Sequence, residues 1–219
     1  MRQNFAINYS LIRSNRKTLA IYIRDGGVEV RAPKRVTLRQ IEDFLNSKEV
    51  WINSKLAESD QRAKQRESFN LDYGDEVLYR GKQHTLGTDF RIPAGLDLDD
   101  IKQACVQTYR QGAHDYITKR TSDIAQQMQL APSAVKISNA KRQWGSCNSK
   151  GVLRFSWRLI MADDEVIDYV IVHELAHLLQ MNHSPCFWQI VGHELPDYRE
   201  RQRRLRQLQE RLAVQNWDV

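Results

Sequence analysis

The chain has 219 residues, of which 41% are hydrophobic and 27% charged, a balance typical of a water-soluble globular protein. No apolar run approaches the roughly 20 residues that span a bilayer, which excludes an integral membrane protein and a membrane partner. The formal net charge of +6 keeps a polyanion among the candidate partners.

The cysteines and the N-terminus favour a cytoplasmic location. Cys105, Cys147 and Cys186 are odd in number and lack metal-ligand spacing, as expected in a reducing compartment. Residues 1–5 also lack the apolar core of a signal peptide.

Residues 1–95 are expected to form a β-rich N-terminal region. Short runs with strand patterning occupy residues 7–13, 19–23, 28–32, 74–79 and 83–86. Between the third and fourth runs, a helix is expected from Leu38 to Ser47 with Thr37 as its cap. Helical periodicity then continues from Val50 into a charged stretch. Residues 91–95 are interpreted as a linker between this region and residues 96–219. The two regions are expected to form one compact unit.

Residues 96–219 combine helices with a small sheet. A helix is expected from Leu98 to about Met128, although Gly112 interrupts its pattern. Strands are expected at residues 135–138 and 151–156, on either side of a loop at 144–150. Carboxylates at residues 163–165 then suit the positive N-terminal end of another helix.

That helix carries the most informative motif of the chain, His173-Glu174-Leu175-Ala176-His177. Two histidines four residues apart leave the same face of a helix, so both imidazoles can bind one metal ion. The pattern H-E-x-x-H indicates a zinc site in which the glutamate holds the catalytic water. Asp168 precedes the motif by five residues and is either an orienting partner of a ligand or a surface charge.

His183 can be a third ligand only if the chain turns back after the motif. In one unbroken helix it would lie about 15 Å along the axis from His173. A single ion, which binds nitrogen at about 2.1 Å, does not reach that far. We therefore expect the helix to end near residues 180–182, with Asn182 as a left-handed cap. Ser184 and Pro185 would then open a further helix.

Three segments resemble the YgjP-like metallopeptidase-domain family of bacterial metal-dependent hydrolases. They are residues 140–147 (AKRQWGSC), 167–177 (IDYVIVHELAH) and 182–188 (NHSPCFW). The resemblance implies an α+β fold with a zincin-like core, in which the motif helix packs on a small sheet, related to SprT-like proteases. It also implies metal ligands at His173, His177 and His183, with Glu174 as the catalytic base. Gln180 stands where metzincins have glycine, so the turn must be made differently here.

The favoured function is a zinc metallopeptidase that holds one Zn²⁺ per chain and acts on a peptide or protein substrate. Glu174 would take a proton from the attacking water and return it to the leaving amine. A metal-dependent nucleotide (phosphoanhydride) hydrolase stays open, although the chain has no P-loop. A non-catalytic module with structural zinc also stays open, although such a site needs no glutamate beside its first ligand.

Substrate contacts are less defined by the sequence. The strand before Trp144 could present an edge to an extended peptide, with Trp144 and Trp157 lining the groove. The oxyanion could be stabilised by Arg142, by the amides of Gly145-Ser146 or by Tyr198.

An arginine-rich C-terminal helix is a second candidate surface. Leu205, Leu208 and Leu212 lie on one stripe at helical spacing. The arginines either bind nucleic acid or form a solvated helix face, and the second interpretation is favoured. They are Arg199, Arg201, Arg203, Arg204, Arg206 and Arg211.

Overall fold

The computed structural model describes residues 7–24 and 26–219, which form two compact units. The first comprises Met1–Phe69 with Ala213–Gln215, and the second comprises Asn70–Leu212 with Asn216–Val219. Residues 1–5, used above to argue against a signal peptide, lie outside the described residues. Among the described residues, no helix has both the length and the hydrophobicity needed to cross a membrane.

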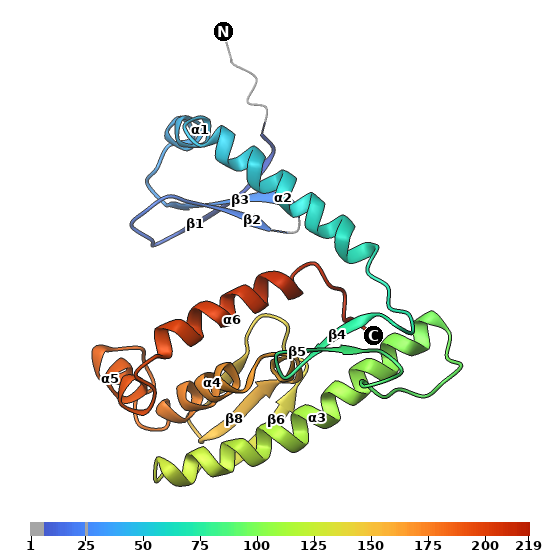
Figure 1. The fold of residues 1–219 in the computed structure, drawn as a ribbon. Helices are drawn as coiled ribbons and strands as arrows, with labels where there is room; N and C mark the ends of the chain where they lie inside the picture. The colour runs from blue at the N-terminus through green and yellow to red at the C-terminus, as the bar shows by residue number, and fades with distance from the viewer. Residues whose placement is uncertain (1–6, 25) are drawn as a thin grey trace. The chain divides into compact units, whose positions relative to one another are not determined.

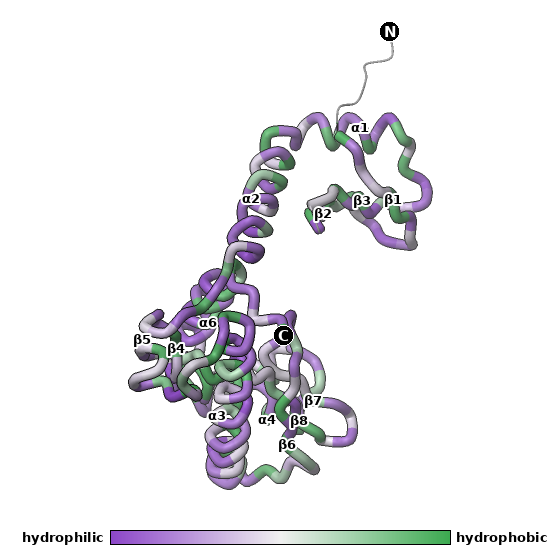
Figure 2. Tube along the Cα trace, turned by 90° about the vertical axis from the view of Figure 1, so that its right-hand side faces the viewer, coloured by the Kyte–Doolittle hydropathy of each residue, from purple (hydrophilic) through white to green (hydrophobic). Residues whose placement is uncertain are grey.

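The first unit is a three-stranded sheet with two helices on one face (Figure 1). Its elements are β1 (Tyr9–Ser14), β2 (Ala20–Arg24), β3 (Gly27–Pro33), α1 (Leu38–Asn46) and α2 (Glu49–Glu67). The strand order is β1-β3-β2, with β1 parallel and β2 antiparallel to β3. Alternate residues of β3 (Val28, Val30, Ala32) pack against Ile41 and Leu45 of α1. Hydrophilic residues dominate α2 along most of its length (Figure 2), and only Ile52 of this helix is buried.

The second unit contains a hairpin, a three-stranded sheet and four α-helices. Its elements are β4 (Glu76–Tyr79), β5 (Lys82–Thr85), α3 (Leu98–Gln127), β6 (Ala134–Ser138), β7 (Gly145–Cys147), β8 (Val152–Ser156), the 3₁₀ helix η1 (Trp157–Met161), α4 (Asp164–Ala176), α5 (Pro185–Glu194) and α6 (Tyr198–Leu212). The sheet order is β6-β8-β7, with β6 parallel and β7 antiparallel to β8. The motif helix α4 contacts α3, α5, α6 and β7. The expected α+β class, with the motif helix packed on a small sheet, is confirmed.

The unit boundary lies at Phe69, whereas the sequence suggested a linker at residues 91–95. The hairpin β4–β5 belongs to the second unit because the Arg80 amide donates to the Ile160 carbonyl (2.8 Å). The hydroxyl of Tyr109 on α3 also donates to the Leu78 carbonyl (2.9 Å). These bonds join residues about 30 to 80 positions apart, so local patterns do not reveal them.

Gly112 has a packing role in the long helix α3, which is continuous as expected. A Cβ atom at residue 112 would lie 2.5 Å from the Tyr79 hydroxyl oxygen. Tyr79 is held in place by edge contacts with Phe90 and stacking on Tyr109. Glycine therefore allows β4 to pack closely on the helix.

Candidate metal centre

The N-terminus of α4 is fixed by its cap and by ion pairs. Asp163 caps the helix by accepting a hydrogen bond from the Val166 amide (3.0 Å). Arg80 binds Asp164 through two bonds of 2.8 and 2.6 Å, and Arg204 of α6 binds Glu165 at 2.5 Å. The following residues, Val166–Val172, are buried except for Asp168. The motif histidines thus stand on a helix that is held at its start and surrounded by packed residues.

The helix ends earlier than the sequence predicts. It stops at Ala176, and His177 is its C-cap. The amide of Gln180 then donates to the Ala176 carbonyl (2.9 Å) and starts the turn. The prediction that Asn182 is a left-handed cap is wrong, because the only described non-glycine residues with positive φ are Arg80 and Gln129.

Asn182 makes the turn through its side chain. Its Oδ1 atom accepts hydrogen bonds from the Ser184 amide (3.1 Å) and from the Gln180 side chain (2.9 Å). Short polar side chains commonly close turns in this way. The next helix begins at Pro185 with Ser184 as its N-cap, as expected.

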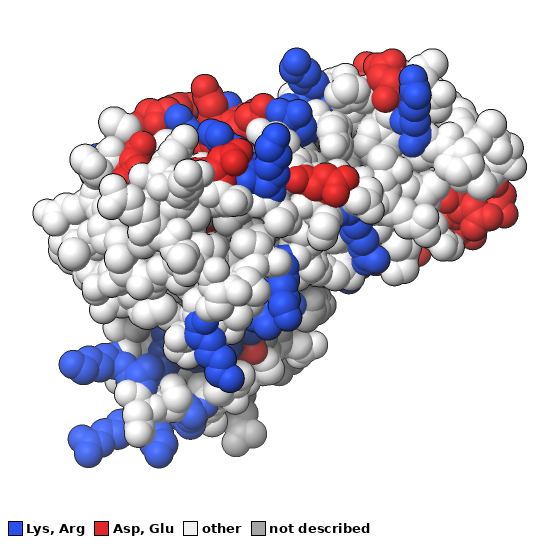
Figure 3. Space-filling view, turned by 90° about the horizontal axis from the view of Figure 1, so that it is seen from below, with Lys and Arg blue, Asp and Glu red and all other residues white. Residues whose placement is uncertain are grey.

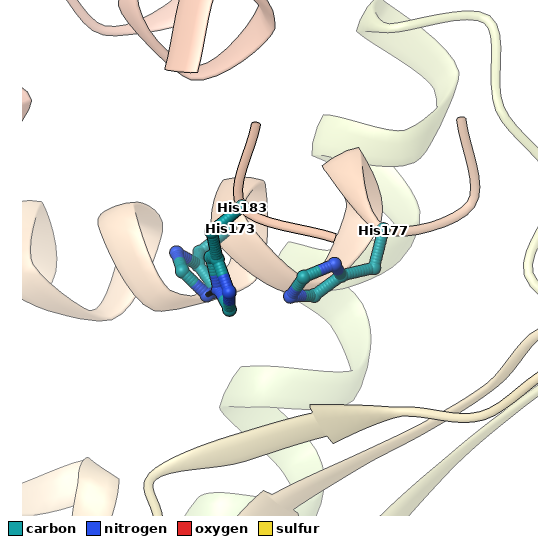
Figure 4. A group of neighbouring side chains, drawn as sticks. All are labelled: His173, His177 and His183. Carbon is teal, nitrogen blue, oxygen red and sulfur yellow. Dashed lines mark hydrogen bonds between the residues drawn. The ribbon is translucent and has the colours of Figure 1, made fainter. Parts of the chain in front are cut away.

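Three imidazoles meet where the chain turns back (Figure 4). One ring nitrogen of each of His173, His177 and His183 lies within 4.8 Å of the others. The Nε2 atoms of His173 and His183 are 3.0 Å apart. Two nitrogens that bind one tetrahedral zinc ion are about 3.3 Å apart, since each bond is about 2.0–2.1 Å long. The spacing of the nitrogens therefore fits a shared metal ion.

Aromatic rings support these imidazoles. Phe187 is fully buried, and its ring centroid lies 4.9, 4.6 and 4.8 Å from those of His173, His177 and His183. Trp188 stacks on His183 at 5.8 Å and on Tyr198 at 5.4 Å. The first turn of α5, through Phe187 and Trp188, thus packs against the histidine rings.

Hydrogen bonding and burial prepare the histidines to bind a cation. His177 Nδ1 lies 3.1 Å from the Gln180 carbonyl oxygen. Because a carbonyl only accepts, Nδ1 carries the proton and Nε2 keeps its lone pair. Burial lowers the pKa of His173 to about 4 and also lowers the pKa of His177. Both rings are therefore neutral near pH 7, the form that binds metals.

Glu174, which follows His173 on α4, is the only buried carboxyl group among the described residues. It is 5% exposed, and burial raises its pKa to about 8. None of the ion pairs between described residues gives it a cationic partner. His173 Nδ1 is likewise buried without a hydrogen-bond partner among the described residues. Three converging imidazoles, with a buried carboxyl group next to them on the motif helix, form a donor set that suits a divalent cation.

Strand β7 runs directly against Glu174, a contact that the sequence does not predict. A Cβ atom at Gly145 would lie 2.6 Å from both Cγ and Oε1 of Glu174. The sequence suggests a loop at residues 144–150, but Gly145–Cys147 pair with Phe155–Leu153 of β8. The residues Gly145, Ser146 and Cys147 show no strand pattern of their own. The strand forms because β8, further along the chain, pairs with it, so the local sequence does not predict it.

Asp168 and Trp157, two further candidates from the sequence, have structural roles in the fold. Asp168 forms two bonds of 2.7 Å with Arg120 and ties α4 to α3, so it orients no ligand. Trp157 is fully buried in the core and lines no groove. Trp144 is half-buried, and Arg142 is exposed.

Several arginines of α6 are engaged in ion pairs within the second unit. Arg201 binds Asp197 at 2.9 Å, Arg203 pairs with Glu200, and Arg204 binds Asp163 and Glu165. The contacts made by Arg204 hold α6 on the start of α4. Arg201 and Arg204 thus have a structural role.

Comparisons with known proteins place the chain in a family. The family model described as "YgjP-like, metallopeptidase domain" matches residues 17–208. Among solved structures, the metallopeptidase zymogen jannalysin of Methanocaldococcus jannaschii is similar, with 22% identity and a TM-score of 0.38, over 42% of this chain and 94% of that chain. The metallopeptidase zymogen abylysin of Pyrococcus abyssi has 20% identity and a TM-score of 0.39, over 46% and 97%. No curated protein matches the chain.

Proposed function

The chain belongs to the YgjP-like metallopeptidase-domain family, and from this membership we propose that it is a zinc-dependent peptidase. One zinc ion per chain would be held by His173, His177 and His183. The observation that carries the proposal is the convergence of their ring nitrogens within 4.8 Å, beside the buried carboxyl group of Glu174. Zinc at this position would polarise the scissile carbonyl and lower the pKa of a water molecule.

Glu174 is the proposed general base. Burial raises the pKa of this group to about 8 in the metal-free protein, and a nearby cation would lower it. A pKa near the working pH is what a group needs to accept a proton and then give it up. Glu174 would take the proton of the attacking water and deliver it to the leaving amine.

We propose that an extended substrate pairs with the outer edge of β7. Trp144 accepts a hydrogen bond from the Ser156 amide (2.8 Å), and the Asn148 amide donates to Val152 (3.2 Å). Backbone groups of an antiparallel strand alternate in direction, so those of Gly145 and Cys147 point away from β8. This edge lies beside Glu174 and could bind a peptide backbone as an added strand. The edge strand β7 also contacts the motif helix α4.

We also propose a cytoplasmic location. Cys105, Cys147 and Cys186 are all free thiols. Free thiols, one of them exposed, suit a reducing compartment.

The test is hydrolysis of quenched fluorescent peptides by the zinc-loaded protein and by Glu174→Gln. The variant is expected to retain zinc and to lose nearly all turnover, because it keeps the ligands and loses the base. Glu194→Gln, an exposed glutamate on α5, is the matched control and should turn over peptide normally. Peptide turnover that survives in Glu174→Gln would refute the assigned role. Turnover of nucleoside triphosphates, with no peptide cleavage, would favour the phosphoanhydride hydrolase.

A further inference from the structure

The first unit, called the N-terminal unit from here on, carries an excess of positive charge that the proposed peptidase chemistry does not use. Residues 7–41 contain eight Lys or Arg residues and only two acidic residues, Asp25 and Glu29. The basic residues are Arg13, Arg16, Lys17, Arg24, Arg31, Lys34, Arg35 and Arg39. Such an excess within one short segment is the electrostatic signature of a polyanion-binding surface.

The sheet topology gathers most of these charges at one end. β1 and β3 are parallel, and their last residues, Ser14 and Pro33, are paired. β2 starts at the same end, where Ala20 pairs with Arg31. The loop at residues 15–19 and the connection at residues 34–37 therefore leave the sheet side by side. Lys and Arg side chains project together at the lower left of Figure 3, with no acidic side chain among them.

Arg13 fixes the geometry of this basic end. One of its guanidinium nitrogens donates to the carbonyls of Pro33 (3.2 Å), Lys34 (3.2 Å) and Val36 (2.6 Å). The connection after β3 is thereby held against β1, with Lys34 and Arg35 exposed. Carbonyl groups do not neutralise a guanidinium, so the positive charge of Arg13 adds to that of its neighbours.

The neighbouring cations also lack carboxylate partners. Among the described residues, no ion pair involves Arg16, Lys17, Lys34 or Arg35. The Nε atom of Arg16 is shielded from solvent and has no hydrogen-bond partner there either. This contrasts with α6, where Arg201, Arg203 and Arg204 already bind carboxylates.

The adjoining open face of the sheet adds an aromatic ring. Ile21 and Ile23 pack toward the core, so Tyr22 between them lies on the opposite face. The guanidinium groups of Arg31 and Arg24 lie 4.9 and 5.2 Å from the centre of its ring. Ile12 of β1 lies on the same face of the sheet as Tyr22, and it is 43% exposed. Arg31 also binds Glu29 of this face at 2.8 Å. A sheet face with an aromatic ring beside arginines can stack an unpaired base.

We propose that the N-terminal unit binds single-stranded nucleic acid, with the phosphates at the basic end formed by residues 13–17 and 34–35 and a base at Tyr22. Charge complementarity supports the polyanion, and the half-buried aromatic ring of Tyr22 on the sheet face favours unpaired bases over a duplex. This binding does not depend on the metal centre.

The test measures the fluorescence anisotropy of a labelled oligothymidylate with the full-length protein, metal-free and zinc-loaded. The double variant Lys34→Glu/Arg35→Glu is expected to bind about tenfold more weakly at about 0.15 M salt and to show a shallower salt dependence, because phosphate contacts are lost. The double variant Arg199→Glu/Arg203→Glu changes the net charge equally on α6 and should bind like the wild type. Circular dichroism establishes that both variants are folded.

Tyr22 distinguishes stacking from charge alone. Tyr22→Ala is expected to weaken binding about tenfold, whereas Tyr22→Phe keeps the ring and should bind normally. Equal affinity for duplex DNA, with no effect of Tyr22→Ala, would overturn the assignment to single strands. Loss of binding only in the α6 variant would move the site to the C-terminal helix. Binding to vesicles of anionic lipid without binding to the oligonucleotide would overturn the proposal altogether.

Discussion

Replacement of Glu174 by glutamine is expected to stabilise the metal-free protein while abolishing catalysis. Burial raises the pKa of Glu174 to about 8, against a value of 4.5 for an exposed glutamate. At pH values between 4.5 and about 8, Glu174 is protonated in the folded protein and deprotonated in the unfolded chain. Folding stability therefore falls as the pH rises from 4.5 to 8, and this cost is complete above pH 8.

The size of the effect follows from that difference in pKa. One pH unit corresponds to about 1.4 kcal/mol, so the wild type loses about 4 kcal/mol of stability between about pH 5 and pH 9 through this group. Glutamine is neutral throughout and is free of this loss. Burial of its neutral amide group costs about as much as burial of the neutral carboxyl group of the wild type, so this pH-independent cost largely cancels in the comparison. The net gain of the variant above pH 8 is therefore about 4 kcal/mol.

The assay is urea unfolding in the presence of a chelator at several pH values, with the transition of the second unit followed by tryptophan fluorescence. Four of the five tryptophans, including Trp157 and Trp217, lie in that unit. Glu210→Gln, at an exposed position of α6, serves as control and should leave the pH dependence unchanged. In zinc-loaded protein the gain should shrink, because the cation stabilises the carboxylate. A stability difference between the wild type and Glu174→Gln that does not change with pH would refute the reasoning.

Two further substitutions test close contacts of glycines. Gly145→Ala places a methyl group 2.6 Å from the Glu174 carboxyl, so it is expected to lower kcat about 100-fold with metal content unchanged. Ser146→Ala is the neighbouring control, and equal activity of the two variants would contradict the contact. Gly112→Ala would ordinarily stabilise a helix by about 1 kcal/mol. Here it meets the Tyr79 hydroxyl at 2.5 Å, so we expect about 1–3 kcal/mol of destabilisation in thermal unfolding, partly relieved in a Tyr79→Phe background. Stabilisation by Gly112→Ala would show that β4 does not pack there.

The convergence of the three histidines was largely predictable because its information is local. The spacing of His173 and His177 fixes their common face, and helix geometry requires a turn before His183. Ser184 and Pro185 carry the signal for the next helix in their own residue types. The details of the turn were not predictable, since the backbone of Asn182 and its side chain can close a turn in two different ways.

Contacts between distant residues explain what the sequence did not reveal. Asp168 looks like a free charge until Arg120, 48 residues earlier, is brought beside it. The strand Gly145–Cys147 exists because β8 pairs with it, and its closeness to Glu174 follows from packing of the sheet on α4. The arginines of α6 suggest a polyanion site by composition. Arg204, however, binds Asp163, whose proximity depends on the tertiary fold.

Metal analysis of the purified protein decides whether His173, His177 and His183 together hold one metal ion. After exposure to zinc at neutral pH and removal of free metal, the wild type should contain about one zinc per chain. His177→Ala should contain almost none, because two ligands bind zinc far more weakly than three. Wild-type protein that stays free of zinc, or a His177→Ala variant that retains it, would contradict the account.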